Sequence, residues 1–167
     1  GFVGTPYICK MLSEHGCNEL AYKLLLNEDC PGWLYPVRMG ATTIWERWDS
    51  IMPDGKINPE GMNSMNHYSY GAVAEWMYRY MGGINPLEDK TGFREIVLKP
   101  MPDYRMSNAR VSYDSPIGKY ESFGKITDDM LEFSFEIPFG GKAYVTLPKA
   151  PETLIVNGGE LKSEDLI

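Results

Sequence analysis

The stretch Leu131-Glu-Phe-Ser-Phe-Glu-Ile137 decides the fold class of the second half of this chain. Every second position is apolar, and Glu or Ser occupies the positions between. Because successive side chains of a strand point to opposite faces, this alternation predicts a half-buried antiparallel strand. Residues 109–113 and 143–147 alternate in the same way, and Leu154–Leu161 predicts a hairpin that turns at Asn157-Gly158. We therefore expect a small antiparallel β-sandwich.

The first half of the chain has the period of helices instead. Thr5 and Pro6 give a helix start, with Thr5 as the cap and Pro6 in the first turn. Apolar residues follow at helical spacing, and Gly16 ends the run. Asn18 opens a second helix, which we expect to continue to about Leu26.

A third helix is predicted from a cap at Asn63 or Ser64 to about Met81. Its apolar residues recur at intervals of three and four, as on one face of a helix. Residues 29–61, between the second and third helices, are rich in Pro and Gly and predict a long loop with a turn at Pro53-Asp-Gly55. The chain is thus expected to be α+β, with helices first and strands second.

The stretch Gly40-Ala-Thr-Thr-Ile-Trp-Glu-Arg-Trp-Asp49 is the most distinctive part of the predicted loop. Its last five residues hold two indoles, two carboxylates and a guanidinium, which suit neither a dry core nor a solvated face. An aromatic-walled cleft for a sugar would use both kinds of group, because indoles stack on sugar rings and carboxylates bind hydroxyls or move protons. The alternative is a partly buried ion pair between Arg47 and either Glu46 or Asp49. The residues alone do not decide between these interpretations.

If this stretch is extended, alternation puts Trp48 on the same side as Glu46 and points Trp45 and Arg47 away. Asp49 would then be placed to orient Arg47. We take Trp48, Trp45 and Arg47 as candidate substrate-binding residues because they flank Glu46 in the chain.

Two motifs together resemble the bacterial α-L-rhamnosidases, family 78 of the glycoside hydrolases. They are Ala41-Thr-Thr-Ile-Trp-Glu-Arg-Trp-Asp49 and Asn66-His-Tyr-Ser-Tyr-Gly-Ala-Val73. The gap between Glu46 and His67 also fits the family, and the remainder to Ile167 resembles its C-terminal β-domain. The resemblance implies Glu46 as the general base and His67 as a residue that hydrogen-bonds a sugar hydroxyl.

The resemblance also implies an arrangement of domains. Residues 1–83 would be the C-terminal part of an (α/α)6-toroid catalytic domain, residues 84–93 a linker, and residues 94–167 a C-terminal β-sandwich. Family members are much longer, so the chain resembles the C-terminal piece of such an enzyme. We expect the general acid to lie outside it.

The implied activity is inverting hydrolysis of terminal α-L-rhamnosyl residues, with a rhamnose-containing glycoside or polysaccharide as substrate. One alternative is a non-catalytic carbohydrate-binding or accessory module. Another is a different (α/α)-toroid glycosidase or a lyase, although a lyase would need more cationic groups than this motif offers. The isolated chain is expected to be inactive, for want of the acid, and to self-associate through uncovered helix faces.

Composition bounds the other partners. The net charge of −7 argues against nucleic acid, whose phosphates require a basic surface. No apolar run approaches the roughly 20 residues that a membrane span needs. The three cysteines, all within the first thirty residues, form neither a zinc pattern nor a disulfide framework. We expect no metal and no cofactor.

Overall fold

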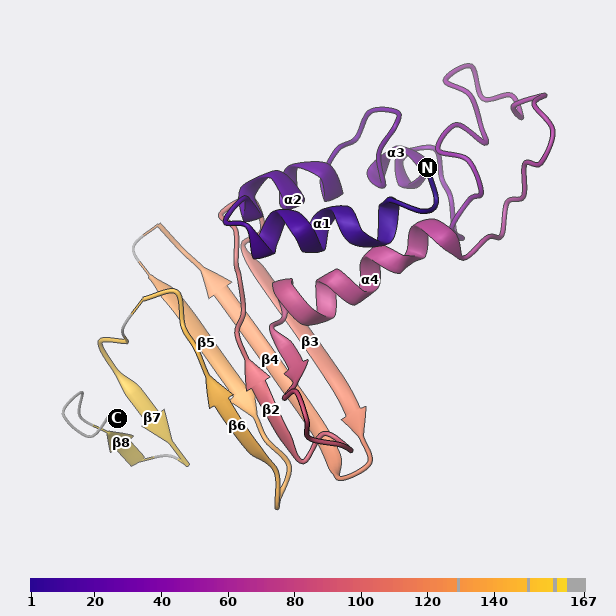
Figure 1. Cartoon of the computed structure of the whole chain (residues 1–167). Helices are drawn as coiled ribbons and strands as arrows, with labels where there is room; N and C mark the ends of the chain where they lie inside the picture. Colours follow the sequence, from indigo (N-terminus) through magenta and orange to yellow (C-terminus); the bar gives the residue numbers. More distant parts are fainter. Residues whose placement is uncertain (129, 150, 158, 162–167) are drawn as a thin grey trace.

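The computed structural model describes residues 1–128, 130–149, 151–157 and 159–161, and it divides into a helical part and a part made of strands (Figure 1). The α+β prediction is confirmed. The described helices are α1 (Thr5–Glu14), α2 (Asn18–Leu25), the short α3 (Leu34–Arg38) and a continuous helical stretch of η1 (Ser69–Ala72), α4 (Val73–Trp76) and η2 (Met77–Met81). Within the described ranges, no helix combines the length and apolarity that a membrane crossing needs.

The first helix begins one residue earlier than predicted. Gly4 is its N-cap, and Thr5 is its first helical residue. The Thr5 hydroxyl donates to the Gly1 carbonyl at 2.8 Å, so it satisfies a group outside the helix instead of capping it. The predicted end is confirmed, because Gly16 adopts a positive φ of 78° just beyond α1.

The third helical stretch begins at Ser69, so the predicted cap at Asn63 or Ser64 is wrong. The Ser64 backbone N–H donates to the Glu46 carboxylate at 2.8 Å, and the Ser64 carbonyl accepts from the Glu46 N–H at 2.9 Å. Both backbone groups of Ser64 are thereby engaged by a segment distant in the sequence. The chain stays non-helical until it has passed this segment.

The predicted loop at residues 29–61 contains one element that the sequence did not indicate, the five-residue helix α3. Its predicted turn at Pro53-Asp-Gly55 is confirmed. The Gly55 N–H donates to the Met52 carbonyl at 2.8 Å, and Gly55 has a φ of 81°. That positive φ is a conformation that glycine adopts without steric cost.

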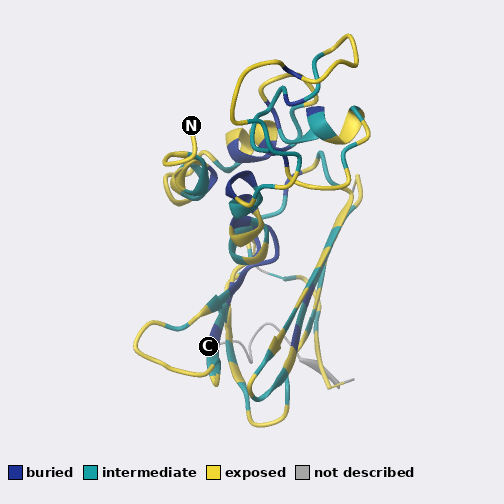
Figure 2. Ribbon diagram, turned by 90° about the vertical axis from the view of Figure 1, so that its right-hand side faces the viewer, coloured by how far each residue is buried: buried dark blue, intermediate teal, exposed yellow. Residues whose placement is uncertain are grey.

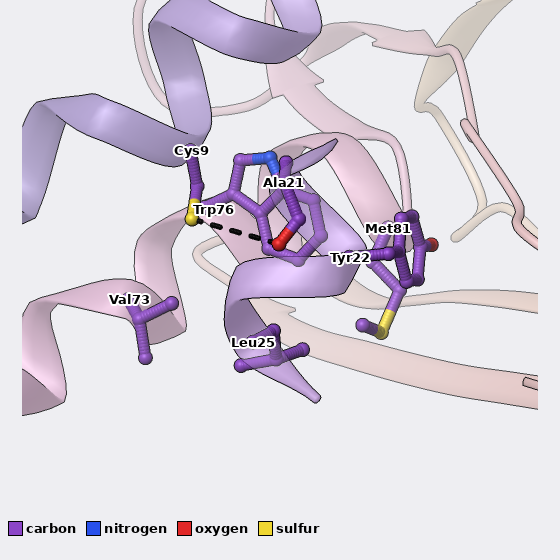
Figure 3. Close-up of a cluster of buried hydrophobic side chains, with 7 residues drawn as sticks. All are labelled: Cys9, Ala21, Tyr22, Leu25, Val73, Trp76 and Met81. Carbon is purple, nitrogen blue, oxygen red and sulfur yellow. Dashed lines mark hydrogen bonds between the residues drawn. The ribbon is translucent and has the colours of Figure 1, made fainter. Parts of the chain in front are cut away.

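The core of the helical part forms where α1, α2 and the third helical stretch meet (Figure 3). Trp76 lies at its centre, with only 2% of its surface exposed, and packs edge-to-face against Tyr22 at 5.1 Å between ring centroids. The buried cluster consists of Cys9, Ala21, Tyr22, Leu25, Val73, Trp76 and Met81.

A chain of hydrogen bonds runs through this core. The Trp76 indole N–H donates to the Ser13 hydroxyl at 2.8 Å, and that hydroxyl donates to Asn18 Oδ1 at 2.8 Å. Asn18 Nδ2 then donates to the Met101 carbonyl at 3.2 Å, and the Tyr22 hydroxyl donates to the same carbonyl at 2.9 Å. The chain therefore starts in α4, crosses α1 and α2, and ends on a residue that follows the second strand.

The described strands are β1 (Ile84–Pro86), β2 (Glu95–Leu98), β3 (Asn108–Ser115), β4 (Gly118–Ile126), β5 (Leu131–Glu136), β6 (Lys142–Val145), β7 (Leu154–Val156) and β8 (Gly159–Leu161). Over the described residues they form one sheet in the order β1-β2-β6, a second in the order β3-β4-β5, and the hairpin β7-β8. The described strand pairs are antiparallel except for β2 and β6, which run parallel. Of the predicted hairpin turn, Asn157 is described and Gly158 lies outside the described residues.

The two three-stranded sheets pack as a sandwich (Figure 2). Ile96 and Leu98 of β2 and Tyr120 of β4 are completely buried between them. The predicted alternation holds in the middle of β5, where Phe133 and Phe135 are half-buried and Ser134 between them is exposed. It fails at both ends of the predicted stretch, because Leu131 and Ile137, which were expected to face inward, are exposed. The strand β1 lies inside the predicted linker 84–93, because residues 84–86 pair with β2.

The segment that joins β2 to β3 contacts the helical part. Gly83, at the end of the third helical stretch, has a φ of 76°, and a Cβ there would lie 2.2 Å from the Pro100 nitrogen. Further along, Arg105 donates twice to the buried carboxylate of Asp103, at 2.7 Å each, and once to the Glu19 carbonyl at 2.8 Å. The hydrogen bonds and ion pair to Arg105 hold the pKa of Asp103 below its usual value.

Candidate active site

The two sequence motifs lie side by side. The His67 N–H donates to the Ile44 carbonyl at 2.7 Å, and the Thr43 hydroxyl donates to the Met65 carbonyl. With the bonds between Glu46 and Ser64, these contacts hold residues 43–46 against residues 64–67 at the N-terminal end of the third helical stretch (Figure 1). The backbones of Glu46 and His67 are thus neighbours, although 20 residues separate them in the sequence.

Glu46 is half-buried, and its carboxylate is held by the backbone. Oε2 accepts the Ser64 N–H at 2.8 Å, which fixes the orientation of the carboxylate. The alternative pairing of Glu46 with Arg47 is wrong: in the described part of the chain the ion-pair partner of Arg47 is Asp49, with 3.3 Å between Nε and Oδ1. Asp49 therefore orients Arg47, as predicted, and its other oxygen accepts from Asn58 Nδ2 at 2.8 Å.

The ring of His67 stacks with two aromatic rings. Phe2 stacks on it with 5.2 Å between centroids and an interplanar angle of 16°, and Tyr68 stacks on it at 5.2 Å and 13°. His67 Nδ1 accepts the Ser69 N–H at 3.3 Å. When Nδ1 accepts a hydrogen bond, Nε2 is the ring nitrogen that carries a proton, so Nε2–H is a donor suited to a hydroxyl oxygen.

A cavity of about 300 Å³ lies beside the first motif. Trp48 stacks on Tyr70 at 3.7 Å between ring centroids, and Trp33 meets Trp48 edge-on at 5.1 Å and donates from Nε1 to the Tyr70 carbonyl. Burial raises the pKa of the Tyr70 hydroxyl. The wall is mostly apolar and consists of Trp33, Pro36, Val37, Ala41, Thr42, Thr43, Ile44, Trp45, Arg47, Trp48 and Tyr70.

This cavity corrects the predicted orientation of the motif. Trp45 and Arg47 line it together with Trp48, whereas Glu46 is not part of its wall. The residues turn instead of running extended, because the Ser50 hydroxyl donates to the Arg47 carbonyl at 3.0 Å. The three candidate substrate-binding residues of the first motif are thus brought together around this cavity, whereas Glu46 and His67 are not among the residues that line it.

Sequence reasoning missed the aromatic residues around the site. Tyr70 forms the platform for Trp48, and Phe2 and Tyr68 enclose His67. Tyr68 and Tyr70 both belong to the second motif, two residues apart, so the sequence itself offered them as candidate site residues. Phe2 is far away in the sequence and gave none.

The comparisons with known proteins agree over both parts of the chain. The family described as bacterial alpha-L-rhamnosidase 6 hairpin glycosidase domain matches residues 1–81, and the bacterial alpha-L-rhamnosidase C-terminal domain matches residues 83–162. This chain belongs to the bacterial α-L-rhamnosidase family. An α-L-rhamnosidase from Formosa agariphila is 38% identical over 97% of the chain, and one from Streptomyces avermitilis is 45% identical over 69% of it.

Solved structures of α-L-rhamnosidases have the same fold over most of the chain. The Streptomyces avermitilis enzyme complexed with L-rhamnose matches with a TM-score of 0.80 and 39% identity over 87% of the chain. The enzyme from Aspergillus terreus matches with a TM-score of 0.82 and 34% identity over 96%. The chain covers only 14% and 18% of these two structures, and 18% and 11% of the two curated α-L-rhamnosidases.

Proposed function

We propose that this chain is part of an α-L-rhamnosidase that removes terminal α-L-rhamnosyl residues from glycosides, with Glu46 as the general base of an inverting reaction. Membership of the family supports a glycosidase activity for the whole protein. In this proposal residues 1–83 belong to the catalytic domain, and residues 94–167 form the C-terminal β-domain.

The observation that carries the proposal is how the Glu46 carboxylate is held. One oxygen accepts the Ser64 N–H, which fixes the orientation of the group. A general base must be ionised and positioned before it can take a proton from water. The nearby acid Asp49 is a poorer candidate, because both of its oxygens already accept from Arg47 and Asn58.

The inverting mechanism needs a second carboxyl group as general acid. The two groups of an inverting glycosidase are about 6.5–9.5 Å apart, so that a water molecule fits between the base and the anomeric carbon. We assign the acid to a part of the whole protein outside these residues. His67 Nε2–H would donate to a hydroxyl of the rhamnosyl ring, and Trp48, Trp45 and Arg47 would contact the substrate from the cavity beside the first motif.

The substitution Glu46→Gln in the whole protein tests this assignment. It keeps the shape of the side chain and removes the base, so kcat with an aryl α-L-rhamnoside should fall by about 10²–10⁴-fold while substrate binding changes little. Glu60→Gln is the matched control, since Glu60 is an exposed acid on the same loop. A Glu46→Gln enzyme with near-normal kcat would show that another group activates the water.

The stereochemical part of the proposal has its own measurement. Proton NMR of the first turnovers should show β-L-rhamnose as the initial product, because inversion at the anomeric carbon converts an α-linkage into a β-product. Initial release of α-L-rhamnose would indicate a retaining mechanism and would remove Glu46 from the role of general base. Binding without turnover in the whole protein would favour the alternative of an accessory carbohydrate-binding module.

For the isolated 167-residue chain we propose inactivity and self-association. Its helical part exposes a row of apolar side chains on α1 and α2, namely Tyr7, Ile8, Met11, Leu20 and Leu24. Light scattering should give a mass above 18.9 kDa, and an aryl α-L-rhamnoside should not be hydrolysed. Robust turnover by a monomer would contradict both statements.

A further inference from the structure

Tyr68 is the most unusual aromatic residue near the candidate active site. It is 84% exposed, although large aromatic side chains gain free energy from burial. The orientation of its ring is nevertheless fixed, because the ring stacks on the His67 imidazole with an interplanar angle of 13°. One face of the phenol is therefore held against His67, and none of the described residues covers the opposite face, which we call the open face.

The position of this open face relates it to the proposed chemistry. His67 is hydrogen-bonded through its backbone N–H to the carbonyl of Ile44, two residues before Glu46, and its ring stacks with both Phe2 and Tyr68. The open face of Tyr68 thus continues the site outward from the histidine proposed to bind the sugar. A planar group that leaves the site on this side would meet a ring already fixed in orientation.

We propose that Tyr68 is a specificity-determining residue that stacks on the leaving group of the glycoside, with aromatic leaving groups as its preferred class. The inference rests on the proposed function. A terminal rhamnosyl residue has a single covalent neighbour, the leaving group, so an open platform next to its binding residues has only that group to contact. Aromatic rings stack face to face in offset geometry, an arrangement that the open face of Tyr68 permits.

The experiment compares two substrates of the whole protein, an aryl α-L-rhamnoside and methyl α-L-rhamnoside. Tyr68→Ala should raise KM for the aryl substrate by roughly two- to twelve-fold, the range that corresponds to one aromatic pair. KM for the methyl substrate should stay within about twofold, since a methyl group offers nothing to stack. Tyr68→Phe keeps the ring and should behave like the unaltered protein with both substrates.

The matched control is Tyr104→Ala, which removes an equally exposed tyrosine from the segment between β2 and β3, at 72% exposure. It should leave both KM values unchanged. If Tyr68→Ala does not fold, judged by its thermal melting curve, Tyr68→Leu takes its place, because it keeps an apolar side chain and lacks the ring.

Two results would overturn the inference. Equal losses with both substrates would mean that Tyr68 only positions His67, and unchanged values with both would mean that its open face contacts nothing. Failure of the proposed function has a different signature: the unaltered protein would then hydrolyse neither rhamnoside.

Discussion

Replacing Ser13 by alanine should destabilise the helical part through a single missing oxygen atom. The Ser13 hydroxyl is 3% exposed, accepts from the Trp76 indole and donates to Asn18. Without it, the Trp76 N–H is a buried donor with no acceptor. The space left by a hydroxyl is smaller than a water molecule needs, so solvent cannot restore the bond.

The expected loss of stability depends on which of the two hydrogen-bond partners of Ser13 stays shielded from water. An unsatisfied buried donor costs about 1–3 kcal/mol, and Trp76 is 2% exposed. Asn18 is only half-buried and can turn to water, so it should add little. We therefore expect the free energy of unfolding to fall by about 1–3 kcal/mol, which corresponds to a Tm lower by roughly 2–12 °C for a domain of this size.

A double-mutant cycle with Trp76→Phe isolates this bond, because phenylalanine has no N–H to leave unsatisfied. Urea unfolding followed by circular dichroism should give a Ser13→Ala effect at least about 1 kcal/mol smaller in the Trp76→Phe background. The control Ser69→Ala alters a buried serine whose hydroxyl has no hydrogen bond among the described residues, and should change stability by less than about 0.5 kcal/mol. Equal effects of Ser13→Ala in both backgrounds would refute the reasoning.

Three further predictions concern other parts of the molecule. Because the pKa of Asp103 is lowered in the folded protein, its contribution to stability is complete at neutral pH and is lost as the pH falls below about 3.9. Asp103→Asn should therefore weaken the decrease of Tm at acidic pH. An unchanged decrease of Tm would contradict this. Burial raises the pKa of the Cys9 thiol to about 11. A thiol reagent at pH 8 should therefore label the two exposed cysteines and leave Cys9 unlabelled until the protein unfolds. Rapid labelling of all three cysteines would show that α1 opens readily. Gly83→Ala should lower Tm by more than about 5 °C in a melting experiment, because the new Cβ would clash with Pro100 and the φ of this residue is positive. The control Gly92→Ala should lower Tm much less, because Gly92 also has a positive φ but no atom lies near the position of its Cβ.

The parts of the fold that the sequence predicted depend on local patterns. The alternation in β5 is a property of consecutive residues, so Phe133 and Phe135 face inward as expected. Gly16 ends α1 because its conformation satisfies the helix terminus locally. The ion pair of Arg47 with Asp49 is one of the two pairings that the motif allowed, and the sequence alone did not choose between them.

The errors arise where a distant group decides the local structure. Ser64 does not cap a helix because its carbonyl, which would accept the first intrahelical hydrogen bond, instead accepts the N–H of Glu46, 18 residues earlier. The direction of Trp45 depends on a turn that is closed by the Ser50 side chain. Neither contact leaves a periodic trace in the sequence, so both required the structure.

The Met101 carbonyl joins two pieces of the molecule that resemble separate modules. It accepts from Asn18 and Tyr22 of α2, and so ends the hydrogen-bond chain that begins at Trp76. A chain cut between Gly83 and Met101 would leave two donors on α2 without their acceptor. The β-domain therefore cannot be exchanged between relatives at a boundary before residue 99. A recombined or designed protein would have to keep residues 99–106 together with the helices that they contact.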